Sequence, residues 1–163
     1  MKKIISTSLL VCMLILALSS CGGGITVSES QIKSALYNET LEEDECELTF
    51  EGSSDDVSAF TLVVHDINAS KIKDRERLKK VIDTLYEDSM QLSWKDLRMC
   101  NAYLAVVEVC GLFIDKETFD ANAFIETALD IICEGQSEIY ENWTVSASVS
   151  IEDDSITIRA VSK

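Results

Sequence analysis

The sequence contains no proline in 163 residues, and it contains only one histidine. The absence of proline excludes a rigid, proline-rich stalk or linker. Positive charge is also scarce, since 14 lysine and arginine residues stand against 29 aspartate and glutamate residues, for a formal net charge of −15. Such an excess of negative charge argues against nucleic acid as a partner, and against electrostatic binding to anionic lipid headgroups.

Familiar catalytic and metal-binding motifs are lacking as well. The chain has no G-x-S-x-G, no phosphate-binding loop, no dinucleotide glycine pattern, no H-E-x-x-H and no C-x-x-C. His65 is predicted on the solvent face of a strand with no nucleophile beside it, which favours a surface role over general-base catalysis. The acidic clusters at 42–47, 55–56 and 153–154 lack the central glycine of an EF-hand loop and favour a solvated surface over a calcium site. The sequence therefore predicts no enzyme activity, no metal site and no cofactor.

The first residues carry an export pattern. Lys2 and Lys3 precede an apolar run at 4–18 that is interrupted only by Ser6, Thr7 and Ser8. As a helix this run would cover only ~22 Å, whereas the hydrocarbon core of a bilayer is ~30 Å thick. The run is therefore predicted to be the apolar part of a cleavable signal peptide, not a permanent membrane span.

The segment Leu18-Ser19-Ser20-Cys21 resembles the lipobox of bacterial lipoproteins, and the resemblance covers roughly the first 24 residues. It implies that a diacylglycerol group is attached to Cys21 and that residues 1–20 are removed as signal peptide. Two acyl chains suffice for stable attachment to a bilayer. Because no aspartate follows Cys21, the resemblance favours the outer membrane in a two-membrane cell, and a single-membrane host is equally compatible. The expected location is the extracytoplasmic side of the cell membrane or outer membrane.

From the lipidated cysteine onward, residues 21–27 are predicted to form a short, glycine-rich tether. Residues 28–163 are predicted to form a single acidic domain. Removal of the leader takes away two lysines and no acid, which leaves 143 residues with a formal charge of −17. Apolar residues make up 47% of the chain and recur periodically, so a packed core can offset the loss of chain entropy.

Two hairpins are predicted at 46–66 and 143–162, because apolar and polar residues alternate on both sides of a polar turn. Apolar stripes with helical spacing predict helices at about 29–42, 70–90, 94–113 and 120–135. Ser28 followed by Gln31 has the spacing of a capping box, and Ser93 with Asp96 begins another helix. The segment from Tyr103 to Phe113 is apolar nearly all round and is predicted to be the central buried helix.

Segregated hairpins and helices indicate an α+β fold, with an antiparallel sheet of two hairpins packed on three to four helices. One face of this sheet is expected to be covered by helices and the other to be solvated. A single hairpin is marginal alone, so the two are predicted to join into one four-stranded sheet. On the solvated face, a flat strip of low charge is expected to be a candidate docking surface, formed by Thr144, Ser146, Ser148 and Ser150 with Thr157 and Arg159.

Four cysteines of the predicted domain are possible disulfide partners: Cys46, Cys100, Cys110 and Cys133. Cys100 and Cys110 would lie ~15 Å apart along one helix, beyond the ~7 Å limit for a disulfide. Two arrangements then stay open, Cys46–Cys100 with Cys110–Cys133 or Cys46–Cys110 with Cys100–Cys133. The alternative is that all four are free thiols that act as small buried apolar groups.

Three functional hypotheses follow. The first is a membrane-anchored lipoprotein of the cell envelope, a non-enzymatic binding or structural module held on the lipid bilayer through acylated Cys21. The second is an immunity-type lipoprotein that neutralises a basic toxin, which the charge of −17 suggests. The third is an enzyme whose site follows no familiar motif.

Overall fold

The computed structural model describes residues 24–37, 41, 46–88, 91–114 and 121–163. The predicted signal peptide, Cys21, the acidic run 42–45 and the residue Asp120 expected to begin a helix lie outside these ranges. Within the described residues, no helix is both long enough and apolar enough to cross a membrane.

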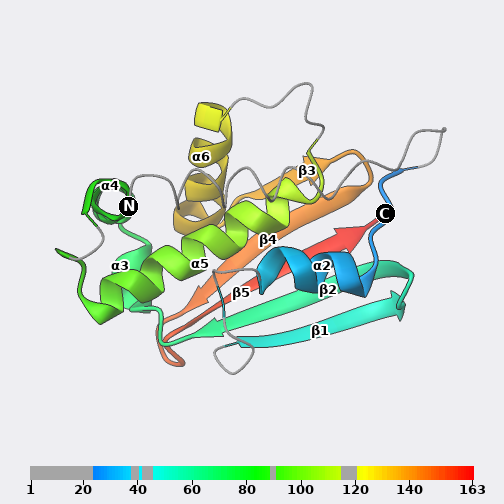
Figure 1. The fold of residues 1–163 in the computed structure, drawn as a ribbon, viewed down its shortest axis with the longest axis horizontal. Coiled ribbons are helices and arrows are strands. Elements are labelled where there is room, and N and C mark those ends of the chain that lie inside the picture. Colours follow the sequence, from blue (N-terminus) through cyan, green and yellow to red (C-terminus); the bar gives the residue numbers. More distant parts are fainter. Residues whose placement is uncertain (1–23, 38–40, 42–45, 89–90, 115–120) are drawn as a thin grey trace.

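A five-stranded antiparallel sheet forms one layer of the fold (Figure 1). Its strands are β1 (Cys46–Ser53), β2 (Asp56–His65), β3 (Ser137–Tyr140), β4 (Trp143–Ser150) and β5 (Ser155–Ser162). Their order across the sheet is β1-β2-β5-β4-β3. Both predicted hairpins are confirmed, and β2 pairs with β5 to join them into one sheet. The prediction of four strands was wrong, because the short strand β3 adds a fifth by pairing with β4.

The helices form a second layer that covers one face of the sheet (Figure 1). They are α2 (Glu29–Leu36), α3 (Ala69–Ile72), α4 (Arg75–Asp88), α5 (Trp94–Gly111) and α6 (Ala121–Leu129), and a π-helical turn, η2 (Asp130–Glu134), continues α6. The α+β fold class is therefore confirmed. The predicted capping box is also present, because Ser28 accepts from the Gln31 amide while the Gln31 side chain accepts from the Ser28 amide.

Two predicted helices have different bounds in the structure. The helix expected at 29–42 ends at Leu36, where Tyr37 is the C-cap. The helix expected at 70–90 is divided into α3 and α4. At the division, the Asp74 carboxylate accepts a hydrogen bond from the Arg77 amide at 3.0 Å, so it caps the new helix α4. The start of α3 is capped from a distant segment, since the Asp154 carboxylate accepts from the Ala69 amide at 2.6 Å.

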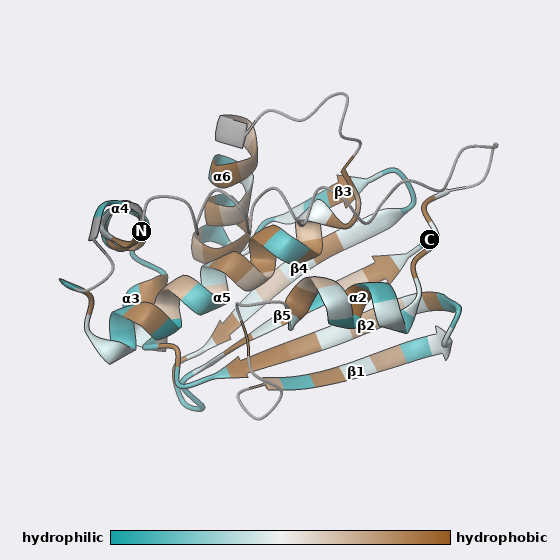
Figure 2. Ribbon diagram, viewed as in Figure 1, coloured by the Kyte–Doolittle hydropathy of each residue, from teal (hydrophilic) through white to brown (hydrophobic). Residues whose placement is uncertain are grey.

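The core lies between the two layers, and α5 runs through it as predicted. Its buried residues include Met99, Tyr103, Val106 and Val109. Apolar residues lie on the helices and on the strands beneath them (Figure 2). At the C-terminal end of α5, Phe113 stacks on Trp143 with ring centroids 4.7 Å apart.

The segment before α2 differs from the tether that the sequence predicts over 21–27. Val27 is fully buried, and its carbonyl accepts a hydrogen bond from the Val57 amide at 3.0 Å. Ile25 also hydrogen-bonds to the domain. The folded part of the chain thus begins by Ile25, because these backbone groups complete the edge of the domain instead of being left to solvent.

Candidate functional site

The helices cover one face of the sheet and leave the other face open (Figure 1). The strand register places Thr157 of β5 between Val63 of β2 and Ser148 of β4. Side chains that are direct partners on neighbouring strands lie on the same face of a sheet. The predicted strip on β4 therefore shares one face with Thr157 and Arg159, and its location is confirmed.

The strip itself is uncharged and carries hydroxyl groups. Thr144, Ser146 and Ser150 are partly exposed, and Ser148 is exposed. Each hydroxyl can both donate and accept a hydrogen bond, so the strip can contact a polar partner of either kind. Ile139 of β3 is the strand partner of Thr144 and is 57% exposed, which adds an apolar side chain at the edge of the same face.

Charged side chains on the open face lie toward β1. Arg159 forms an ion pair with Glu51 at 2.9 Å and donates to the Thr61 hydroxyl at 3.2 Å. His65 lies 3.5 Å from the Glu47 carboxylate, and its side chain is 43% exposed. The surface position predicted for His65 is confirmed. The open face is therefore divided into a charged part over β1, β2 and β5 and a neutral part over β4.

All four cysteines of the domain are free thiols in the structure, so neither pairing left open by the sequence is formed. Three of the thiols each meet a different group. Cys133 donates to the Ile72 carbonyl at 3.4 Å, Cys100 lies 4.0 Å from the Val81 carbonyl, and Cys46 lies 3.9 Å from the Tyr37 hydroxyl. Cys110 is fully buried.

Burial makes three of these thiols poor nucleophiles. It raises the pKa of Cys100 and of Cys110 to about 12, and that of Cys133 to about 11. The thiolate is the form that attacks carbon or binds metal, and little of it is present near neutral pH at such pKa values. Among the described residues, no three cysteine, histidine, aspartate or glutamate side chains come together as a metal site.

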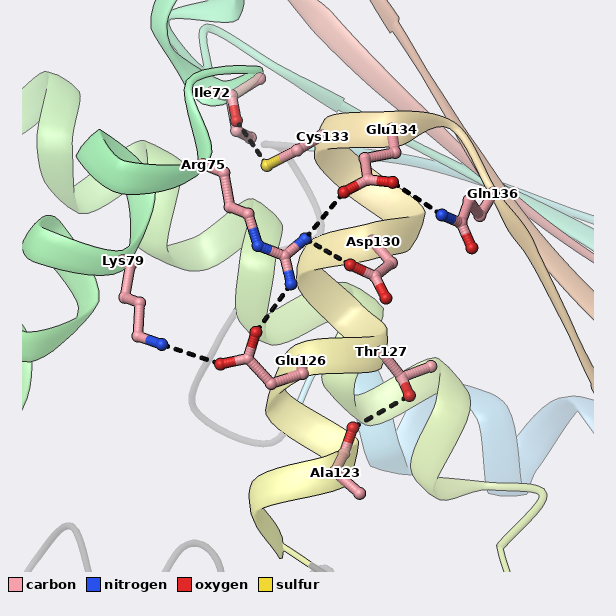
Figure 3. Close-up of polar contacts among 10 residues, drawn as sticks. All are labelled: Ile72, Arg75, Lys79, Ala123, Glu126, Thr127, Asp130, Cys133, Glu134 and Gln136. Carbon is pink, nitrogen blue, oxygen red and sulfur yellow. Dashed lines mark hydrogen bonds and ion pairs between the residues drawn. The ribbon is translucent and has the colours of Figure 1, made fainter.

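The most extensive polar cluster joins α4 to α6 and η2 (Figure 3). Arg75 forms ion pairs with three carboxylates, those of Glu126 at 2.7 Å, Asp130, and Glu134 at 3.3 Å. Lys79 forms a further pair with Glu126 at 2.8 Å. Hydrogen bonds from Lys79 and from Arg75 hold the pKa of the Glu126 carboxyl below its ordinary value. We refer to these five residues as the Arg75 cluster.

The Arg75 cluster was not predicted from the sequence. Its three acids recur every fourth residue along α6 and η2, and its two basic residues lie four apart at the start of α4. That spacing puts each set on one helical face, which is the only signal that could have indicated the pairing. The two cations offset most of the charge of the three carboxylates and link α4 to the α6–η2 helix, so the chemistry of the cluster is structural.

Comparison of the chain with models of protein families, with curated proteins and with solved structures gave no match.

Replacement of Arg75 by methionine is expected to destabilise the fold by on the order of 1 kcal/mol, because three carboxylates would face one another without their shared cation. A urea unfolding series measures the change.

Since the Glu126 pKa is lowered by folding, this contribution is present above the ordinary glutamate pKa of about 4.3 and is lost as the pH falls through the folded value. The difference between the variant and the parent should therefore be present at pH 7 and shrink as the pH falls below about 4.3. Lys79→Met is the control and should have a smaller effect, because Glu126 keeps its bond to Arg75. Equal losses for the two variants at pH 7 would contradict a central role for Arg75.

Proposed function

We propose that this chain is a lipoprotein of the cell envelope, anchored to a membrane through acylated Cys21, whose domain is a non-enzymatic binding or structural module. The lipobox-like segment Leu18-Ser19-Ser20-Cys21 carries the proposed anchor, and the place where the fold begins adds to it. The chain is already part of the fold at Ile25, and Val27 is fully buried. Three peptide steps from Cys21 to Gly24 span at most ~11 Å. A lipid on Cys21 would therefore hold this domain directly against the membrane surface.

The placement of the reactive side chains supports a non-enzymatic role. The thiols of Cys100 and Cys133 point to backbone carbonyls, Cys110 is fully buried, and all three have raised pKa values. The imidazole of His65 contacts Glu47 on the open face. The same open face, with its neutral strip on β4, offers a flat surface to another component of the envelope.

A basic partner is the second candidate, and the distribution of charge favours it. Among the described residues, several basic side chains are held in ion pairs, including those of Lys33, Arg75, Arg77, Lys79 and Arg159. Local pairing thus takes up much of the positive charge and leaves an acidic remainder. A toxin-neutralising domain of this kind would attract a basic protein, with an affinity that falls as salt concentration rises.

Replacement of Cys21 by serine tests the anchor. We expect the variant to lose the mass of the attached lipid and to move from the membrane fraction to the soluble fraction. The physical reason is that a domain with a formal charge of −17 is repelled by anionic headgroups, so the acyl chains supply the attraction. Cell fractionation with intact-mass measurement gives both readouts.

Cys12→Ser is the matched control for this experiment, because Cys12 belongs to the predicted leader and should be removed with it. This control should stay lipidated and membrane-bound. Retention of the Cys21→Ser protein on the membrane, in the same amount as the parent, would contradict the proposed anchor.

A further inference from the structure

The first residues that the structure describes form a short segment bound to one end of the sheet. The Ile25 amide donates to the Asn142 side-chain oxygen at 2.8 Å. The Ile25 carbonyl accepts from the Trp143 indole nitrogen at 2.7 Å and from the Asn142 side-chain nitrogen at 3.3 Å. Both hydrogen-bonding groups of Ile25 are therefore held by two consecutive residues at the turn between β3 and β4.

These two residues are themselves fixed. The Asn142 side chain also donates to the Ser162 hydroxyl at 3.0 Å, and its carbonyl accepts from the Lys163 amide at 2.8 Å. Trp143 is 1% exposed and packs against Phe113. Because its partners are fixed, Ile25 is held at a defined place on the domain. We refer to Asn142 and Trp143 as the latch.

The opposite end of the domain lies far from the latch. Strand β4 runs from Trp143 to Ser150, and at ~3.3 Å per residue the next residue, Ile151, lies about 26 Å away. Helix α5 gives a second measure of the distance between the two ends. Its C-terminal end lies near Trp143, and its first residue, Trp94, is ~26 Å from that end along the helix axis. Ile151 and Trp94 are each 65% exposed. In Figure 1 the β4–β5 turn and the start of α5 both lie at the end away from the C-terminus.

We propose that the latch fixes the orientation of the domain on the bilayer, with the β3–β4 turn facing the lipid headgroups and the β4–β5 turn facing away. The inference rests on the proposed lipidation of Cys21. Only Gly22 and Gly23 separate that cysteine from Gly24. Because so short a link follows the lipid, the end of the sheet that holds Ile25 is kept at the membrane. The open face and the exposed side chains of the far end then stand away from the headgroups, where a partner can reach them.

The surface near the latch shows that the anchor, not headgroup attraction, sets this orientation. Asp55 and Asp56 lie in the β1–β2 turn, and Glu141 lies in the β3–β4 turn. The β1–β2 turn is at the same end as the latch, since the Glu29 amide donates to the Ser54 carbonyl at 2.9 Å. Carboxylates at this end would be repelled by anionic lipid, so only a covalent link would keep it at the bilayer.

Energy transfer from the domain to dye-labelled lipid headgroups tests the orientation. A donor dye is attached to one of two introduced cysteines, Asp55→Cys near the latch or Glu152→Cys at the far end, in the full lipidated protein on phosphatidylcholine vesicles. Both positions are exposed acidic residues in turns, and each substitution removes one acid, so the two variants form a matched pair. With a dye pair whose transfer falls steeply over ~26 Å, we expect several-fold stronger transfer from position 55 than from position 152.

Two variants test the latch itself. In Gly24→Ala, the new Cβ would lie 2.4 Å from the Asn142 side-chain carbon, so that side chain has to move away from Ile25. Asn142→Ala removes the side chain that hydrogen-bonds to the Ile25 amide and carbonyl. In both variants we expect the difference between positions 55 and 152 to shrink severalfold, while circular dichroism stays unchanged. Gly111→Ala is the control, because no atom lies within 4 Å of its added Cβ, and it should keep the difference.

The possible results are distinct. Equal transfer from the two positions in the bound parent protein would overturn the fixed orientation. A full difference that persists in Gly24→Ala and in Asn142→Ala would overturn the role of the latch. Failure of the lipoprotein proposal gives another result, since an unlipidated protein would not bind the vesicles and would show no transfer from either position.

Discussion

Replacement of Trp143 by alanine should lower the free energy of unfolding by about 3–5 kcal/mol, the usual cost of removing a large buried aromatic side chain. Trp143 is 1% exposed. Its ring stacks on Phe113 and lies 6.3 Å from the ring of Phe60, between the helical layer and the sheet. The substitution also removes the indole donor to the Ile25 carbonyl at 2.7 Å. A urea unfolding curve followed by circular dichroism measures the loss.

Trp94→Ala is the matched control, since the chain has only these two tryptophans. Trp94 is 65% exposed, and its contact in the structure is the Arg98 guanidinium, 4.7 Å from its ring. An exposed contact between a cation and an aromatic ring contributes about 0.5–1 kcal/mol, so the control should lose no more than that. If both tryptophans had equal effects, the core position of Trp143 would be wrong.

The hairpins could be predicted because each is encoded locally, by apolar residues that alternate across a polar turn. The sequence of β3 has too little of this alternation to predict a strand. It has only four residues, and Ile139, one of its two apolar side chains, points to the open face and is 57% exposed. It is a strand because it pairs with β4, a long-range contact that its own sequence does not indicate. Tertiary pairing of this kind often outweighs local preference.

The helices show the same division between local and long-range causes. The capping box at Ser28 joins residues three apart, and it was predicted correctly. The start of α3 depends on Asp154, which caps it from 85 residues away. The Arg75 cluster likewise joins residues 47 to 59 positions apart. The open strip on β4 could be predicted because its alternation is local, whereas the latch on Ile25 joins residues 117 and 118 positions apart.

The thiols of the folded protein should react with iodoacetamide very slowly at pH 8. Burial raises the pKa of Cys100 and of Cys110 to about 12, whereas an unperturbed cysteine has a pKa of about 8.5. The thiolate fraction at pH 8 is then lower by roughly a thousandfold in the folded state, and the rate of alkylation follows that fraction. Cys133 should react somewhat faster, because it is less buried and its pKa is raised only to about 11. Timed alkylation followed by mass measurement gives the order of the sites.

The same shifts predict how stability changes in alkali. A thiol whose pKa is raised by folding contributes stability that is fully present below the unfolded pKa of about 8.5 and is lost as the pH rises through the folded value. The free energy of unfolding should therefore fall from about pH 8.5 upward. Burial also raises the pKa of the Tyr140 hydroxyl beside Cys110, which adds to the decline at higher pH.

Alkylation in urea without reductant tests the free thiols directly. The unfolded mature chain should take up four alkyl groups, on Cys46, Cys100, Cys110 and Cys133, because none of them is paired in the structure. Two groups would reveal one disulfide and no groups would reveal two, and either result would contradict the thiol contacts described for these residues. Rapid alkylation of Cys110 in the folded protein would contradict its burial instead. The two measurements therefore separate an error in pairing from an error in packing, and only the first would reopen the two disulfide arrangements.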